Sequence, residues 1–164
     1  MDYQKIINKY YPQDDALRRL LLHHSRQVAD RCLQIARKHP ELDVDRQFLE
    51  EAAMLHDVGI YQCDAPSIQC RGKEPYIKHG PIGGDLLRQE GFSRHARVAE
   101  RHTGTGLPGY EPETLEEQIV CYADKFYSKS NPDHVRTVEE TAQSLAKFGQ
   151  VGVEKFLAWA EKFE

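Results

Sequence analysis

Residues 49–60 read LEEAAMLHDVGI, and this stretch decides the fold. Its apolar positions from Leu49 onward recur at helical spacing, which predicts a helix with one side in the protein core, ended by Gly59. His56 lies on the core-facing side and Asp57 follows it directly. An ionisable side chain that is buried without a partner costs several kcal/mol. The pattern therefore indicates that the core contains a bonding partner for the His56 and Asp57 side chains.

Helical periodicity also dominates both sides of this stretch, and we identify no strand of two-residue period. We expect further helices at about 14–38, 80–90, 93–102, 115–129, 134–148 and 151–163. Residues 58–78 have no clear period and predict a long loop, and the Gly/Pro-rich residues 104–109 predict a flexible rim of a pocket. The sequence thus favours an all-α fold of about seven helices.

Histidine is the unusual component of the composition, with eight copies against one Trp and two Met. His24, His56 and His102 lie on core-facing helical stripes, and Asp124 lies on the apolar stripe of a fourth helix. One inward histidine is more often a hydrogen-bonded core residue than a metal ligand. Several inward ligand-type groups on successive helices favour a metal ion, which would satisfy all of them together. His79, at the start of another helix, is a natural fifth member.

The order of these residues resembles the HD-domain metal-dependent phosphohydrolase superfamily, in its dinuclear H…HD…H…H…D branch. The resemblance covers about residues 20–130, within a single HD domain predicted for residues 1–164 with C-terminal helices at about 134–163. The motifs that carry it are His24-Ser25-x-x-Val28-Ala29, Leu55-His56-Asp57-Val58-Gly59-Ile60, Lys78-His79-Gly80-Pro81, Arg101-His102-Thr103-Gly104 and Ala123-Asp124-Lys125.

The resemblance implies two divalent transition metal ions, chosen among Fe, Mn, Co, Ni and Zn, with a hydroxide between them. The implied ligands of the first ion are His24, His56, Asp57 and Asp124. Those of the second are Asp57, which bridges, His79 and His102. The implied activity is hydrolysis of a phosphomonoester or phosphoanhydride, with a nucleotide or dinucleoside polyphosphate as the expected substrate. The surroundings of His102 and Asp124 are similar to bacterial HD proteins that hydrolyse diadenosine tetraphosphate, although residues 126–130 lack the Ile-Glu-Pro-x-Arg of that subgroup.

Basic residues near the implied ligands are candidate substrate contacts. Lys125 resembles the phosphate-contacting lysine of many relatives and is the second candidate catalytic residue beside Asp57, with a surface ion pair as the alternative. Arg71, Lys73 and Lys78 lie in the loop that leads to His79, where they could either contact phosphate oxygens or remain solvated. His95 shares a helix face with His102 and is a further candidate. His23 is expected as a neighbour of the ligands rather than a ligand, and His39 and His134 are expected at the surface.

Other functions stay open on the sequence alone. An HD-type di-iron oxygenase would use the same six ligands, whereas a regulatory module that has lost the chemistry would usually lack one or more of them. The net charge of −4 argues against a nucleic-acid polymer as partner, and the absence of a long apolar run argues against a membrane. We expect a small phosphorylated substrate, reduced cysteines in a cytoplasmic protein, and a homodimer as one use of the apolar C-terminal helices.

Overall fold

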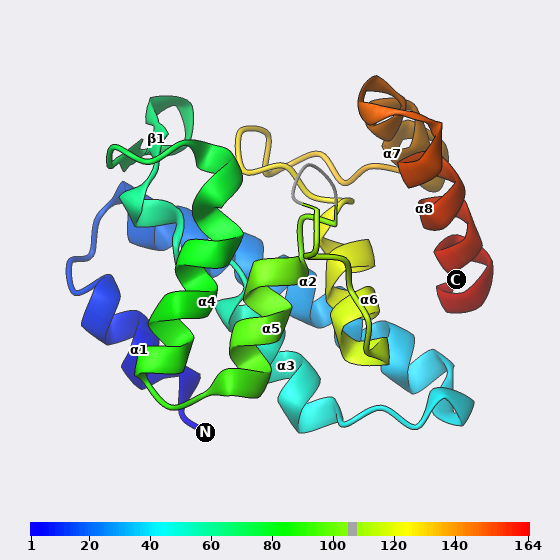
Figure 1. The fold of residues 1–164 in the computed structure, drawn as a ribbon, viewed down its shortest axis with the longest axis horizontal. Helices are drawn as coiled ribbons and strands as arrows, with labels where there is room; N and C mark the ends of the chain where they lie inside the picture. Colours follow the sequence, from blue (N-terminus) through cyan, green and yellow to red (C-terminus); the bar gives the residue numbers. More distant parts are fainter. Residues whose placement is uncertain (105–107) are drawn as a thin grey trace.

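The computed structural model describes residues 1–104 and 108–164, and this part of the chain contains eight α-helices and one two-stranded hairpin (Figure 1). Residues 105–107, within the predicted pocket rim, lie outside the described part. The helices are α1 (Tyr3–Tyr10), α2 (Ala16–Lys38), α3 (Arg46–Leu55), α4 (His79–Gln89), α5 (Ser93–Arg101), α6 (Leu115–Asp124), α7 (Val138–Leu145) and α8 (Gln150–Phe163). The all-α prediction is confirmed, with one helix more than expected.

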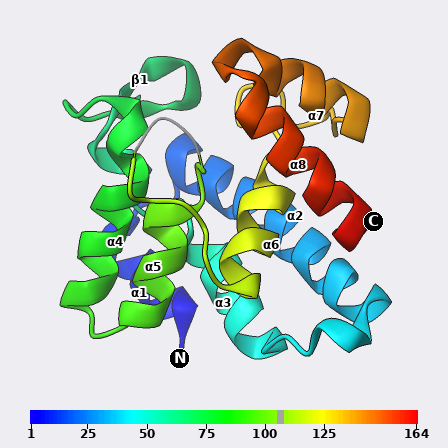
Figure 2. The same cartoon turned by 45° about the vertical axis from the view of Figure 1, so that its right-hand side comes forward.

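Helix α2 is the longest element, and α3 and α6 pack against it. The Asp15 carboxylate caps its first turn by accepting a hydrogen bond from the Arg18 N–H at 2.9 Å. One face of α2 is buried along its whole length, from Leu21 through Val28 to Ile35. Helices α4 and α5 form an antiparallel pair on one side of this group, and α7 and α8 lie on the other (Figure 2).

The helix predicted from residues 49–60 is present as α3, and the turn that follows it brings α4 close. A Cβ at Gly59 would lie 2.5 Å from the His79 carbonyl oxygen and 2.6 Å from the Gly83 nitrogen, so only glycine fits there. This close approach places the start of α4 beside the His56-Asp57 pair.

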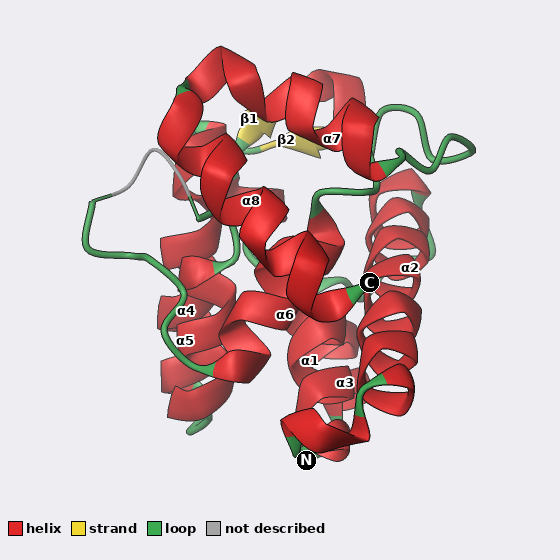
Figure 3. Ribbon diagram, turned by 90° about the vertical axis from the view of Figure 1, so that its right-hand side faces the viewer, coloured by secondary structure: helices red, strands yellow, loops and turns green. Residues whose placement is uncertain are grey.

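The predicted loop at 58–78 contains short 3-10 turns and a small hairpin of β1 (Asp64–Ala65) and β2 (Cys70–Arg71). The strands are antiparallel, with Asp64 opposite Arg71 and Ala65 opposite Cys70. Figure 3 shows these two strands near one end of an otherwise helical molecule. Strands of two residues are too short for a periodic sequence signal.

Two other predictions differ from the structure. Helix α1 was not expected, because only Ile6 and Ile7 of its eight residues are buried and the remainder looks polar. Helix α6 ends at Asp124 rather than near 129, since the chain turns there and Tyr127 pairs with Val135 in an isolated bridge. In the described part of the chain, no helix is both long and apolar enough to cross a lipid bilayer.

Candidate metal centre

The six predicted ligands come together at the centre of the helices. His24 lies in the middle of α2, His56 and Asp57 directly follow α3, His79 begins α4, His102 follows α5, and Asp124 ends α6. The four imidazoles and Asp57 are each at most 5% exposed, and the Asp124 side chain is 18% exposed. The pairing of ligand groups expected from the sequence resemblance is therefore present in three dimensions.

The two oxygens of Asp57 face different pairs of imidazoles. Asp57 Oδ2 lies 3.3 Å from His24 Nε2 and 3.2 Å from His56 Nε2. Asp57 Oδ1 lies 3.3 Å from His79 Nε2 and 3.2 Å from His102 Nε2. The Asp124 Oδ1 atom completes the first group, at 2.8 Å from His24 Nε2 and 3.2 Å from His56 Nε2. This arrangement makes two adjacent ligand groups that share one carboxylate.

Backbone carbonyls hold three of the imidazoles in a fixed orientation. His56 Nδ1 donates to the Ala53 oxygen at 2.6 Å, His79 Nδ1 to the Tyr76 oxygen at 2.5 Å, and His102 Nδ1 to the Ala99 oxygen at 2.6 Å. A carbonyl oxygen can only accept, so each Nδ1 carries the proton. Nε2 is therefore the atom of each ring that faces the carboxylates, and it coordinates a cation when it carries no proton, as is usual for histidine ligands with such outer partners.

The charges of the centre depend strongly on burial and on one another. Burial lowers the pKa of His102 to about 4 against the attraction of Asp57. Burial acts in the same direction on His56, but the charges and hydrogen bonds of Asp57 and Asp124 outweigh it and raise the pKa of His56 to about 10. For Asp57, burial alone would raise the pKa, but the imidazoles and a nearby lysine hold it well below its usual range. Burial would likewise raise the pKa of Asp124, but the hydrogen bonds of His24 and His56 hold it well below its usual range, so both carboxylates are ionised.

Divalent cations fit these residues. Asp57 Oδ1 is buried without a hydrogen-bond partner in the described part of the chain, whereas Oδ2 has the Lys129 ammonium at 2.8 Å. A buried carboxylate oxygen in this position is costly unless a cation satisfies it. Imidazole and carboxylate together suit Fe, Mn, Co, Ni or Zn. The donor set and the orphaned Oδ1 atom therefore both indicate divalent metal binding.

Lys129 belongs to the centre although the sequence did not point to it. Its ammonium lies 2.8 Å from Asp57 Oδ2 and donates to the Tyr76 hydroxyl at 2.8 Å, and its side chain is 11% exposed. Burial would lower the pKa of Lys129, but the charges of Asp57 and Asp124 raise it well above its usual range. The predicted helix through 129 gave no reason to place this residue beside Asp57. The early end of α6 allows the chain to return there.

A cavity of about 320 Å³ adjoins Lys129 and Tyr76. Hydroxyl-bearing residues line much of the remainder, namely Ser67 from the hairpin, and Ser128 and Ser130 from the segment after α6. This cavity combines a cation with hydroxyl groups beside the ligand cluster, which suits an anionic substrate group.

The candidate substrate residues lie elsewhere. Lys125 donates to the carbonyl oxygens of Thr103 at 3.1 Å and Cys121 at 3.3 Å, and no hydrogen bond or ion pair among the described residues joins its ammonium to a ligand side chain. His95 pairs with Glu51 at 2.8 Å, at a distance along α5 from His102. The substrate roles of these two residues remain predictions.

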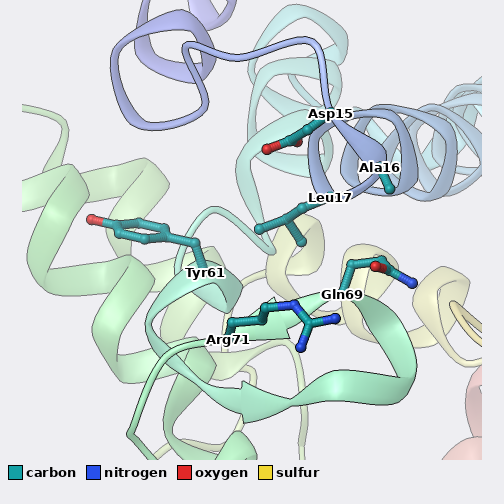
Figure 4. A pocket seen from close by; sticks show the side chains of 6 residues that line it. All are labelled: Asp15, Ala16, Leu17, Tyr61, Gln69 and Arg71. Atoms are coloured by element: carbon teal, nitrogen blue, oxygen red, sulfur yellow. The ribbon is translucent and has the colours of Figure 1, made fainter.

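The three basic residues of the loop are exposed. Arg71 lines a separate surface cavity of about 390 Å³ together with Asp15 and Tyr61, as Figure 4 shows. Lys78 pairs with Glu74 at 3.8 Å. No hydrogen bond or ion pair within the described residues joins these side chains to the ligand cluster, and their role in substrate binding is likewise untested.

Comparison with known proteins gives the family. The family model described as the HD domain matches residues 21–128, which include all six ligands. A tRNA (cytidine(56)-2'-O)-methyltransferase of Thermoplasma volcanium is 30% identical over 121 residues, covering 66% of this chain and 32% of that protein. The corresponding protein of Picrophilus torridus is 29% identical over 150 residues, covering 78% of this chain and 40% of that protein.

An uncharacterised protein of Methanocaldococcus jannaschii is 33% identical over 105 residues, which are 56% of each chain. The chain thus spans between about a third and just over half of the length of these curated relatives. No solved structure matches it. With the ligand cluster intact and the model matching most of its length, the chain belongs to the HD domain family.

Proposed function

We propose that the protein hydrolyses a phosphomonoester or phosphoanhydride at this centre, with two divalent transition metal ions as cofactors. The substrate class that we propose is a nucleotide or dinucleoside polyphosphate. The observation that carries the proposal is the single carboxylate of Asp57 facing two imidazole pairs, one with each oxygen. Family membership supports a hydrolase in general, and the shared carboxylate supports the dinuclear form.

The six ligand residues would form two metal sites that share Asp57. His24, His56, Asp57 and Asp124 would hold one ion, and Asp57, His79 and His102 the other. Two ions so held would lower the pKa of a water molecule and neutralise negative charge on phosphoryl oxygens. The Lys129 ammonium, which borders both Asp57 and the adjoining cavity, is placed to attract a phosphoryl oxygen.

The burial of the centre supports a small substrate. Among the ligands only the Asp124 side chain is appreciably exposed, and the adjoining cavity of about 320 Å³ is of the size that holds small molecules. A net charge of −4 gives no general attraction to a nucleic-acid polymer. The names of two relatives refer to tRNA methylation. The matched region is at most 40% of those proteins, so we do not assign that activity to this chain. Four free thiols fit a reducing, cytoplasmic environment.

The test is phosphate release by protein loaded separately with Mn, Co, Ni, Zn or Fe(II), with metal content measured in each sample. Nucleoside monophosphates, nucleoside polyphosphates and dinucleoside polyphosphates serve as substrates. We expect turnover of at least one class, and its loss after chelation and recovery after reloading. Two results would contradict the proposal. One is no phosphate release from any substrate by protein with both sites occupied. The other is oxygen consumption by the iron form that depends on substrate, which is the behaviour of the oxygenase alternative.

A further inference from the structure

A second cavity, of about 260 Å³, lies between α6, α8 and the segment that follows α5. Figure 2 shows α6 with that segment on one side and α8 on the other. Cys121 and Lys125 line the cavity from α6 and its end, and Lys155, Phe156 and Trp159 line it from α8. The cavity thus joins the family core to the C-terminal helices.

The lining of this cavity combines aromatic surface with positive charge. Lys125 and Lys155 face one acidic residue, Glu111. The Lys125 ammonium donates only to neutral groups within the described residues, the carbonyl oxygens of Thr103 and Cys121 and the Cys121 sulfur. An excess cation next to an aromatic wall suits an aromatic ring that carries hydrogen-bond acceptor atoms.

Exposed apolar side chains surround the same cavity. Phe148 is 74% exposed and Val151 is 77% exposed, and both belong to its lining. The Lys155 ammonium lies 6.0 Å from the centre of the Trp159 ring. An aromatic ring that covers apolar groups at a cavity mouth removes them from water, which lowers the free energy.

The cavity begins next to two of the metal ligands. Lys125 follows Asp124 directly, and Gly104 lies two residues after His102. Consecutive Cα atoms are about 3.8 Å apart, so the backbone of these two lining residues lies close to the backbone of the two ligands. Residues that line the cavity therefore lie within two positions of His102 and Asp124 along the chain.

The aromatic wall lies outside the matched family region, since α8 begins at residue 150 and the match ends at 128. The HD core supplies the metal ligands, whereas α8 supplies Lys155, Phe156 and Trp159. This division is expected of a feature that sets the specificity of one protein rather than the chemistry of its family.

We propose that this cavity is a specificity subsite that holds the aromatic base of a nucleotide substrate against Trp159, with the Lys125 and Lys155 ammonium groups donating hydrogen bonds to acceptor atoms of that base. The inference rests on the proposed phosphate hydrolysis at the metal centre. The volume supports a single ring system, because complete small-molecule pockets usually measure about 300–1,000 Å³. A second copy of the chain on the exposed Phe148 and Val151 is the competing occupant.

The experiment uses the single tryptophan of the chain as its probe. Metal-stripped protein, which cannot turn over substrate, is titrated with AMP, with ribose 5-phosphate and with inorganic phosphate while the Trp159 fluorescence is recorded. In parallel, the kcat/KM of the metal-loaded enzyme for AMP is divided by that for ribose 5-phosphate. Lys155→Gln is the test variant. Lys162→Gln is the matched control, since Lys162 is an exposed lysine of the same helix that is no part of the cavity lining.

We expect AMP, but not ribose 5-phosphate or phosphate, to change the fluorescence saturably. Lys155→Gln should weaken AMP binding and lower the kcat/KM ratio, each about fivefold, which is the scale of one charged contact at a partly exposed site. Lys162→Gln should change neither. Unchanged fluorescence with AMP, together with an unchanged ratio in Lys155→Gln, would overturn the inference and leave the hydrolysis intact.

Two further outcomes separate the remaining possibilities. AMP binding at Trp159 in a protein that hydrolyses no phosphate would support the cavity and contradict the proposed function alone. Fluorescence that changes with protein concentration, with a doubled mass in solution and no response to AMP, would overturn the inference in favour of a second copy.

Discussion

At Asp57 one side chain meets four imidazoles, with Oδ1 and Oδ2 each within 3.3 Å of two Nε2 atoms. A carboxylate with no exposed surface is stable in this position only with cations or protonated partners around it. The helical stripes indicated His24, His56, His102 and Asp124 as inward groups with His79 as a fifth member, and the family resemblance implied Asp57 as the shared ligand. All six lie together in the structure.

Replacement of Asp57 tests whether both ligand groups depend on it. Asp57→Asn keeps the size of the side chain but removes its charge, so we expect the protein to lose most of its metal from both groups and all measurable phosphate release. Elemental analysis and a phosphate-release assay measure these effects, and circular dichroism checks the fold. Asp30→Asn, at an exposed aspartate of α2, is the control. Retention of both ions by Asp57→Asn would refute the shared-ligand arrangement.

Lys129 is the residue of the centre that the sequence did not predict. No motif contains it, and it is found only because the chain turns after α6 and returns its ammonium to Asp57 at 2.8 Å. Lys125 has the motif position, but its ammonium binds carbonyl oxygens.

Substitution of Lys129 and substitution of Lys125 should lower the activity to different extents, and one assay can compare them. We expect Lys129→Met to lower kcat/KM about tenfold or more, which corresponds to ~1.4 kcal/mol or more of transition-state stabilisation. Lys125→Met should lower it less for substrates without an aromatic group. Lys5→Met, at an exposed lysine of α1, controls for surface charge. The reverse order of effects would support the assignment of the phosphate contact to Lys125.

At the scale of elements, the helices with long buried stripes were predictable and the short or irregular ones were not. The stripe of α2 gave its bounds closely, from a predicted 14–38 to Ala16–Lys38. Helix α6 was predicted too long because Phe126 continues its apolar spacing, although Phe126 packs against Tyr122 from beyond the helix end. Tertiary packing, which periodicity does not record, decides such ends.

The start of α6 depends on Glu117, which closes a capping box with Thr114 and pairs with Arg97 at 2.9 Å. Its side chain is only 3% exposed. Burial alone would raise the pKa of Glu117, but the Glu113 N–H and the Arg97 guanidinium lower it below its ordinary value. Because its folded pKa is the lower one, this carboxylate stabilises the fold above its unfolded pKa of about 4.3, and the contribution is lost as the pH falls through the folded value.

We therefore expect Glu117→Gln to lower the free energy of unfolding by about 2 kcal/mol at neutral pH. The difference from the unaltered protein should shrink as the pH falls below about 4, where the native carboxylate becomes protonated. Urea unfolding at a series of pH values measures both. Glu154→Gln, at an exposed position of α8, should have little effect at any pH. A difference independent of pH would mean that shape, not charge, is what Glu117 contributes.

For the whole molecule, the centre joins five helices that also meet through apolar packing and through ion pairs such as Arg97–Glu117. His24, Asp57, His79, His102 and Asp124 come from sequence positions that span a hundred residues. Ions that bind these groups only in the folded chain stabilise the fold by mass action. The prediction of one domain over residues 1–164 is not tested by this geometry.

Metal removal should accordingly lower the melting temperature. At a free ion concentration of 100 times the dissociation constant, one site contributes about 2.7 kcal/mol, which corresponds to a change of roughly 5–10 °C for a chain of this length. Calorimetry of metal-loaded and chelated protein measures the change, with Asp57→Asn as the variant that should not respond. Equal melting temperatures with and without bound metal would contradict the role of the centre in holding the helices together.

The shared carboxylate also couples the two ligand groups thermodynamically. An ion at either group withdraws charge from Asp57, so the affinity of the other group changes, and reciprocity requires the same factor in both directions. Loading is therefore a coupled equilibrium rather than two independent ones. If full activity needs both ions, the activity depends on the concentration of the weaker-bound ion. The coupling through Asp57 then sets how steep this dependence is.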